Sequence, residues 1–333
     1  MGQTTLQYAQ KGYRGRATSV NRKNESRRLG KFLHWRLVQA RQKAKGMPLR
    51  ASRSRIATMP HLHVIPAPPL SRFVELLWYY EEPPKPHAKE RLMPDGCVSF
   101  IINLAEDETR LYDPDDVSKV TTFSPCSLSG PQTKCFVIDT DEQTCVVGAS
   151  FRAGGAVPFL GLPSDELHNR HLNLEDLWGF RARELRERLL AAPNPRAKLR
   201  MLELALLERA AGIFDGQPVV EYAVQNFLAR PATVKIAEVS DKTGFSARRF
   251  IELFKLHVGM TPKLFCRVRR FQRVLTCITS GQPVNWAGVA LDGGYFDQAH
   301  FIHDFRAFSG INPSKYLADY KDFPRHPNHL PLV

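Results

Sequence analysis

The chain has 333 residues, a formal net charge of +14 and a hydrophobic content of 43%. This length accommodates two domains of ordinary size, and the hydrophobic content provides a core for most of the chain. No apolar run approaches the roughly 18–20 residues that a membrane-spanning helix needs. Residues 1–20 also lack the apolar stretch of a secretory signal. We therefore expect a cytoplasmic protein that does not engage a membrane.

The net charge is concentrated at the N-terminus. Residues 1–55 hold 15 Lys and Arg and a single acid, whereas the remainder has 32 basic and 32 acidic residues. The overall charge is therefore no evidence for DNA binding. Within the remainder, residues 61–212 are acidic, with 17 basic and 22 acidic residues, and residues 242–273 hold nine basic residues against one acid. A local basic stretch on helices is typical of a phosphate-contacting surface.

Cysteine and histidine spacing does not favour a metal site. The six cysteines are scattered without a C-x-x-C pair, so neither a zinc site nor a disulfide framework is indicated, and we expect buried or half-buried thiols. Four histidine pairs have metal-like spacing but no third clustered ligand. These pairs are His61/His63, His168/His171, His300/His303 and His326/His329. We predict no metal and no cofactor.

The first segment, residues 1–58, is basic, polar and punctuated by Gly and Ser, with one short candidate helix at Phe32–Ala44. Such a composition is typical of disorder. Three interpretations stay open: a nucleic-acid-binding arm, a translation start placed too far upstream, and a flexible solubilising tail. An arm would add salt-sensitive, non-specific affinity.

Residues 61–212 combine β-prone runs with later helices. After the proline-rich joint at residues 66–69, Ser71 is expected to cap the apolar stretch at residues 73–78. Short β-prone runs are separated by turn signals such as Asp95-Gly96, which favours a small β-barrel or sandwich. These runs lie at residues 97–104, 134–139 and 144–151, and leucines at helical intervals follow over 174–212. The predicted fold class is therefore α+β.

After a linker at residues 213–217, residues 218–320 are predicted to be all-helical. Thr233 is expected to cap a helix over residues 234–241, and a turn containing Gly244 follows. Ser246 then caps a third helix, residues 247–257, whose Phe250, Leu253 and Phe254 point inward. This order is typical of a helix-turn-helix, whose second helix enters the major groove of DNA.

The same pattern recurs further along the chain. A helix over residues 286–292 leads to a Gly293-Gly294-Tyr295 turn, and Asp297 caps a helix over residues 298–308. The two caps, Ser246 and Asp297, are 51 residues apart (297 − 246). Between them Pro262 starts a long helix, residues 263–279, that can act as a rigid spacer. Two such units can reach major-groove segments about one turn, roughly 10 base pairs, apart. Residues 321–333 are interpreted as a tail.

Two stretches in this region carry a specific resemblance. Residues 244–262, beginning Gly-Phe-Ser-Ala-Arg-Arg-Phe, and residues 294–316, beginning Gly-Tyr-Phe-Asp-Gln-Ala-His-Phe, resemble the two helix-turn-helix units of the AraC family of bacterial transcription regulators. The resemblance covers about 100 residues and implies a seven-helix DNA-binding domain. One departure is His303, which stands where the family usually has a basic residue.

The outward positions of the predicted units supply the candidate DNA contacts. Arg can grip guanine bidentately and Glu can accept from cytosine, but Arg248 could also touch phosphate and Glu252 could merely form a surface ion pair. Gln298 can pair with adenine, or its side chain can cap the helix. Ile251 could pack against a thymine methyl. The predicted DNA-binding residues are Ser246, Arg248, Arg249, Glu252, Lys255, Arg267, Arg270, Gln298, His303 and Arg306.

Residues 61–212 also resemble an uncharacterised sensor-like domain that often precedes AraC-type units. The resembling pieces are residues 92–100, 147–155 and 174–178. By that resemblance the domain binds an effector or mediates dimerisation. Asp95, in the turn into a strand, and Arg152 are candidate ligand contacts. Near Arg152, the glycines before a helix can cradle an anion. A structural turn at Asp95 and an ion pair at Arg152 are the alternatives.

Other function classes are weighed against this interpretation. No G-x-S-x-G, Walker, H-E-x-x-H or facial-triad pattern occurs, so no enzyme is predicted. The main alternative is a non-specific nucleic-acid-binding protein driven by the basic tail. The expected partners are double-stranded DNA, RNA polymerase and an unknown small-molecule or protein effector, and we favour a homodimer.

Overall fold

The computed structural model describes residues 61–84, 88–210, 216–322 and 326–332. Strands dominate as far as Asn173, and helices follow, which confirms the α+β fold class. The N-terminal segment and its candidate helix at Phe32–Ala44 lie outside the described residues, as do residues 211–215, which include part of the predicted linker. Residues 58–333 belong to one compact unit.

The first of two sheets is antiparallel and has the strand order β1-β2-β9-β4-β7-β10. Buried and less buried positions alternate in part of β2 and β4, whereas β7 is buried at all four positions. Phe100, Phe151 and Leu128 are fully buried. The strands are β1 (Leu62–Val64), β2 (Val74–Glu81), β4 (Ser99–Asn103), β7 (Cys126–Ser129), β9 (Cys145–Phe151) and β10 (His171–Asn173).

Helices from residues 157–209 complete the core of this first sheet. Trp178 packs edge-on against Phe100, with ring centroids 5.3 Å apart, and Phe159 packs against Phe151 at 5.0 Å. Leucines of α4 and α5 at helical intervals join the same cluster. The helices are α2 (Val157–Leu160), α3 (Glu175–Trp178), α4 (Phe180–Ala191) and α5 (Pro195–Arg209), with 3₁₀ turns at Leu70–Arg72 (η1) and Ser164–Leu167 (η2).

The prediction at Ser71 is wrong. Ser71 lies in the 3₁₀ turn η1, and the apolar residues that follow form strand β2, which pairs with β1 and β9. A short apolar run fits a helix and a strand equally well by periodicity. Its partners in the sheet, which lie elsewhere in the sequence, decide between the two.

The second sheet has the order β11-β3-β8-β5-β6. Its last strand in sequence, β11, comes from the very end of the chain, where a tail was predicted, so that prediction is wrong. His329 and Leu330 of β11 pair with Leu92 and Arg91 of β3. Leu330 is 1% exposed and belongs to the core of the C-terminal helices. The strands are β3 (Lys89–Leu92), β5 (Thr109–Tyr112), β6 (Val120–Phe123), β8 (Phe136–Asp139) and β11 (His329–Pro331).

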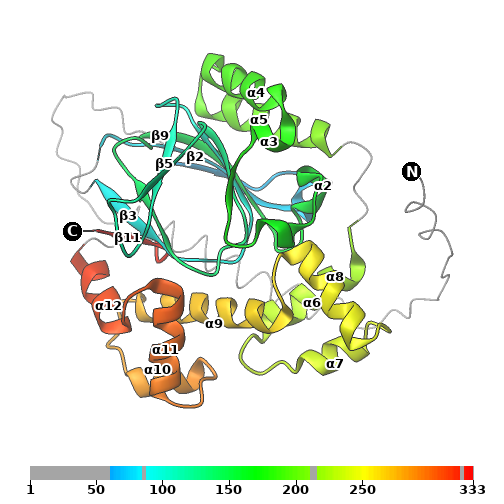
Figure 1. The fold of residues 1–333 in the computed structure, drawn as a ribbon, viewed down its shortest axis with the longest axis vertical. Helices are drawn as coiled ribbons and strands as arrows, with labels where there is room; N and C mark the ends of the chain where they lie inside the picture. The colour runs from blue at the N-terminus through cyan, green and yellow to red at the C-terminus, as the bar shows by residue number, and fades with distance from the viewer. Residues whose placement is uncertain (1–60, 85–87, 211–215, 323–325, 333) are drawn as a thin grey trace, which may run out of the picture. The chain divides into compact units, whose positions relative to one another are not determined.

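Seven helices make up the rest of the described chain, α6 to α12, the number that the family resemblance implies. Figure 1 shows α9 running between two groups, with α6–α8 at one end and α10–α12 at the other. Phenylalanines from all parts of this bundle, including Phe227, Phe271 and Phe305, are fully buried. The helices are α6 (Pro218–Ala229), α7 (Ile236–Asp241), α8 (Ala247–Val258), α9 (Pro262–Ile278), α10 (Trp286–Asp292), α11 (Gln298–Ser309) and α12 (Pro313–Asp322).

Direct hydrogen bonds join the β-rich part, residues 61–210, to the helical part, residues 216–322. Arg91 of β3 donates to the Ser309 carbonyl at 3.2 Å, and Arg269 of α9 donates to the Asp95 carbonyl at 3.2 Å. His168 Nδ1 lies 2.7 Å from the carbonyl oxygen of Gly259, the residue that ends α8. The helical part is therefore anchored on the β-rich part through both of its helix-turn-helix regions and through α9.

His171 makes the stability of the fold depend on pH. Its ring lies 4.6 Å from the Phe136 ring and 6.0 Å from the Phe123 ring, between centroids. Burial lowers the pKa of His171 from 6.5 to about 4. The unfolded chain therefore binds the extra proton first, and stability falls as the pH drops from about 6.5 toward 4.

This shift corresponds to at most about 3 kcal/mol. We expect urea unfolding of the wild type to show this loss between neutral and acid pH, and His171→Gln to lose less stability over that interval. The exposed His303→Gln is the control and is expected to follow the wild type. Equal pH dependence in His171→Gln and the wild type would contradict the assignment.

Candidate DNA interface

The first helix-turn-helix unit, residues 236–258, follows the predicted geometry. Gly244 has φ of 74°, a left-handed conformation that favours glycine in the turn. Ser246 caps α8 by accepting from the Arg249 amide at 3.3 Å. Phe250 and Phe254 are buried against the other helices. The predicted cap at Thr233 is wrong, because α7 begins two residues later, after Lys235, without a side-chain cap.

The second unit, residues 286–309, repeats this arrangement. Asp297 caps α11 by accepting from the His300 amide at 2.7 Å, and Phe301, Phe305 and Phe308 face the core. Gly294 has φ of 70°, and a Cβ there would stand 2.6 Å from Ala232 Cβ. Glycine is therefore required by both conformation and space.

The outer face of α8 presents the predicted polar residues to solvent. The Arg248 side chain is 91% exposed and the Arg249 side chain 61% exposed. Arg248 Nε donates to Glu252 Oε1 at 3.0 Å. An ion pair this exposed contributes little to stability, so DNA can break it at small cost. Ser246 and Lys255 lie at the two ends of the same helix.

The outer face of α11 carries fewer charges. Gln298, His303 and Arg306 are all exposed. Because Asp297 makes the cap hydrogen bond, the Gln298 side chain is not needed for that role. His303 stands 51 residues after Glu252, at the equivalent position of the repeat.

Arg267 and Arg270 were predicted to bind DNA, but the structure uses both inside the protein. Arg267 forms an ion pair at 2.6 Å with Asp304, whose side chain is only 3% exposed. Arg270 lies 3.8 Å from the same carboxylate, donates to the Gly294 carbonyl at 3.0 Å, and covers the Tyr295 ring. These two arginines therefore hold α9 against the second unit.

Sequence reasoning missed two aromatic residues on the candidate interface. Phe245 is 41% exposed and Phe296 is 92% exposed. Phe245 directly precedes Ser246, the N-cap of α8. Phe296 directly precedes Asp297, the N-cap of α11, so the two rings are equivalent in the 51-residue repeat. The repeat was the available signal, because an aromatic residue at both pre-cap positions stands out once the units are aligned.

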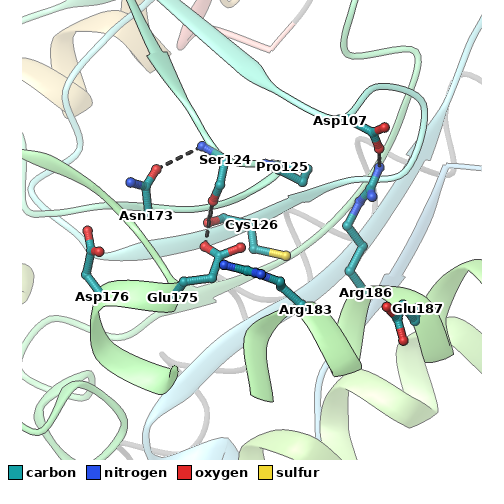
Figure 2. A pocket seen from close by; sticks show the side chains of 10 residues that line it. All are labelled: Asp107, Ser124, Pro125, Cys126, Asn173, Glu175, Asp176, Arg183, Arg186 and Glu187. Carbon is teal, nitrogen blue, oxygen red and sulfur yellow. Dashed lines mark hydrogen bonds and ion pairs between the residues drawn. The ribbon is translucent and has the colours of Figure 1, made fainter. Parts of the chain in front are cut away.

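The two candidate ligand contacts in the β-rich part have structural partners. Asp95 accepts from the Cys97 amide at 2.9 Å, and burial raises its pKa. Arg152 donates to the Ser71 carbonyl at 2.8 Å, and it forms no ion pair, the alternative considered for it, with any described residue. Neither lines the hollow of about 520 Å³ on the β-rich part that Figure 2 shows.

The described residues offer no cluster of metal ligands and no membrane-spanning helix. Among them, no group of three or more His, Cys, Asp or Glu could hold a metal ion. No described helix is long and apolar enough to cross a bilayer. All six cysteines are free thiols, and Cys277 is exposed, contrary to the expectation for that residue.

Two family models match the chain. Residues 239–319 match a family described as a helix-turn-helix domain, and residues 62–173 match a domain of unknown function, DUF6597. The XylDLEGF operon transcriptional activator of Pseudomonas putida is 28% identical over 105 residues, 31% of this chain and 32% of that protein. Residues 239–319 are therefore an AraC-type helix-turn-helix region.

Other matches cover the AraC-type region or a larger share of the chain. An uncharacterized HTH-type transcriptional regulator of Haemophilus influenzae is 31% identical over 81 residues, 24% of this chain and 27% of that protein. The crystal structure of ToxT from Vibrio cholerae O395 aligns over 73% of this chain and 95% of its own, at 10% identity and a TM-score of 0.38. The matches to the curated regulators span only about a third of their length.

Proposed function

We propose that this chain is a sequence-specific DNA-binding transcription regulator of the AraC type that inserts α8 and α11 into successive major-groove segments. The observation that supports it is the repeat itself: two capped helices with exposed outer faces, 51 residues apart, on either side of α9. A spacer helix with one face buried along its length fixes the separation of the two units. Half-sites about one turn, roughly 10 base pairs, apart then follow.

Base contacts are assigned mainly to the first unit. Arg248 is free to leave Glu252 and grip guanine, and Glu252 can then accept from cytosine. Arg249, Lys255 and Arg306 are proposed to contact phosphate. On α11, Gln298 and His303 are the polar residues proposed to contact bases. Arg267 and Arg270 are left out of the proposed contact set, because their guanidinium groups form ion pairs with Asp304.

The β-rich part is proposed to modulate this binding. It contacts the end of α8 through His168, α9 through Asp95, and the end of α11 through Arg91. An effector that shifts any of these contacts would change how the two helices are presented. RNA polymerase as a partner, a homodimer and a cytoplasmic location stay predictions.

Selection of random duplex DNA by the full-length protein tests the proposal. We expect two conserved blocks about one turn apart, and we expect Arg248→Ala to alter one block and lower affinity for the selected site about 10- to 100-fold. Arg181→Ala, an exposed arginine on α4, is the matched control and is expected to leave the motif unchanged.

The outcome that contradicts the proposal is binding without an enriched motif. If affinity then decreases as the salt concentration rises and is lost when residues 1–58 are removed, the protein binds nucleic acid non-specifically through its basic segment. That segment carries the net charge of the whole chain. On this alternative, removing it alone therefore abolishes binding.

A further inference from the structure

A hollow of about 520 Å³ lies where α3 and α4 meet the β-rich part. Its volume is within the range of small-molecule sites. Figure 2 shows side chains from the two helices facing those of the strands and loops across the hollow. The lining residues are Asp107, Ser124, Pro125, Cys126, Asn173, Glu175, Asp176, Arg183, Arg186 and Glu187.

Part of this lining is already fixed by hydrogen bonds. Ser124 Oγ donates to Glu175 Oε2 at 2.6 Å, and the Ser124 amide donates to Asn173 Oδ1 at 2.8 Å. Arg186 donates to the Asn103 carbonyl at 2.8 Å and pairs with Asp107 at 2.8 Å. This part of the lining is thus held in place before any ligand arrives, which reduces the ordering cost of binding there.

Other lining groups are exposed to solvent at the rim of the hollow and have no partner among the described residues. Arg183, Asp176 and Glu187 form no side-chain ion pair or hydrogen bond within the described residues. The Asn173 side-chain nitrogen also has no partner among the described residues, while its oxygen is taken by Ser124. The hollow therefore offers a guanidinium group and an amide donor for an anionic group, and two carboxylates for a cationic group.

We propose that this hollow binds a small zwitterion of the amino-acid class. The ligand carboxylate pairs with Arg183, for which a guanidinium group is the preferred bidentate partner. The ligand ammonium group lies against Asp176 and Glu187. A simple anion is disfavoured, since the lining holds four carboxylates and two guanidinium groups. A simple amine leaves Arg183 unused.

The hollow also has a short connection to the first recognition helix. Asn173 ends strand β10, which pairs with β7 along its length from His171 to Asn173. Just before β10, His168 lies 2.7 Å from the Gly259 carbonyl oxygen at the end of α8. A Cβ at Gly259 would stand 2.3 Å from Pro131, which follows β7. Through these two contacts, movement of the two strands would displace the end of α8.

This coupling rests on the proposed function, because it assumes that α8 binds DNA. A ligand that bridges α3, α4 and Asn173 favours one position of β10. That position sets the end of α8, so ligand binding changes affinity for the selected DNA site. A coupling of this kind is reciprocal: DNA changes ligand affinity by the same factor.

Thermal unfolding of the full-length protein with each proteinogenic L-amino acid, supplied singly at millimolar concentration, tests the site. We expect at least one to raise the unfolding midpoint by about 2–4 °C. Arg183→Gln is expected to weaken its apparent affinity at least about tenfold, and Asp176→Asn is expected to weaken it as well. Arg181→Gln, an exposed arginine of the same helix outside the hollow, is expected to bind normally.

Each outcome is decisive for one part of the proposal. No shift with any amino acid, or an equal shift in Arg183→Gln, overturns the site. An equal shift with acetate or methylamine alone overturns the ligand class. A ligand that binds but leaves affinity for the selected DNA site unchanged overturns the coupling. The proposed function fails separately, through the absence of any selected motif.

Discussion

Replacing Asp304 by alanine is expected to lower the free energy of unfolding by about 3 kcal/mol. The Asp304 carboxylate is almost fully buried on the inner face of α11 and faces Arg267 and Arg270 of α9. Without it, two guanidinium groups lose their counter-charge at a helix–helix contact. Arg267 is one-third exposed and regains some hydration, which keeps the loss at the lower end for a buried pair.

The same substitution is expected to affect DNA binding unequally. Because α9 and α11 lose their tie, the second block of the selected site should weaken while the first block is retained. Urea unfolding and a repeated selection measure the two effects. Asp319→Ala is the control: this acid pairs with Lys315 on the surface of α12, at 3.0 Å, and its loss should cost below about 1 kcal/mol. Equal losses in both variants would refute the structural role of Asp304.

The parts of the fold that follow from local chemistry were predictable. The caps at Ser246 and Asp297 and the turn at Gly244 each depend on a few adjacent residues. A side-chain oxygen that satisfies the free amides of a helix start gives a signal within four positions. The inward phenylalanines follow from helical periodicity alone. The same elements carry the resemblance to the AraC family.

The errors arose where contacts between distant segments decide the outcome. Residues 329–331 are too few to predict a strand, and only pairing with β3, more than 200 positions earlier, makes them one. The ion pairs of Arg267 and Arg270 with Asp304 were missed because that partner is remote in sequence. A signal did exist, since Asp304 falls on the same helical face as Phe301 and Phe308 and needs a buried cation.

The hollow of Figure 2 could not be predicted for the same reason. Its lining comes from four separate stretches between residues 107 and 187, none of which carries a motif. The candidate ligand residues from the sequence, Asp95 and Arg152, lie at turns and have structural partners. A glycine-rich turn gives a local signal in the sequence, whereas side chains brought together by a helix packing on a sheet give none.

Replacing Phe296 by alanine is expected to lower affinity for the selected DNA site about tenfold. Phe296 is 92% exposed in front of the N-cap of α11, and Ile302 on the same helix is 37% exposed. Burying a phenylalanine ring in a complex releases about 1.5–3 kcal/mol, and about tenfold in affinity corresponds to roughly 1.4 kcal/mol. An apolar side chain in the major groove contacts the thymine methyl group. We therefore expect thymine in the second block.

Thymine-to-uracil replacement in that block isolates the methyl contact. The wild type should bind uracil-containing DNA several-fold more weakly than thymine-containing DNA, whereas Phe296→Ala should bind both alike. Phe180→Ala is the control, because Phe180 is 76% exposed at the start of α4, outside the two units. Since Phe296 is exposed, its loss should leave the unfolding midpoint unchanged. A wild type indifferent to uracil would exclude the methyl contact while leaving sequence-specific binding intact.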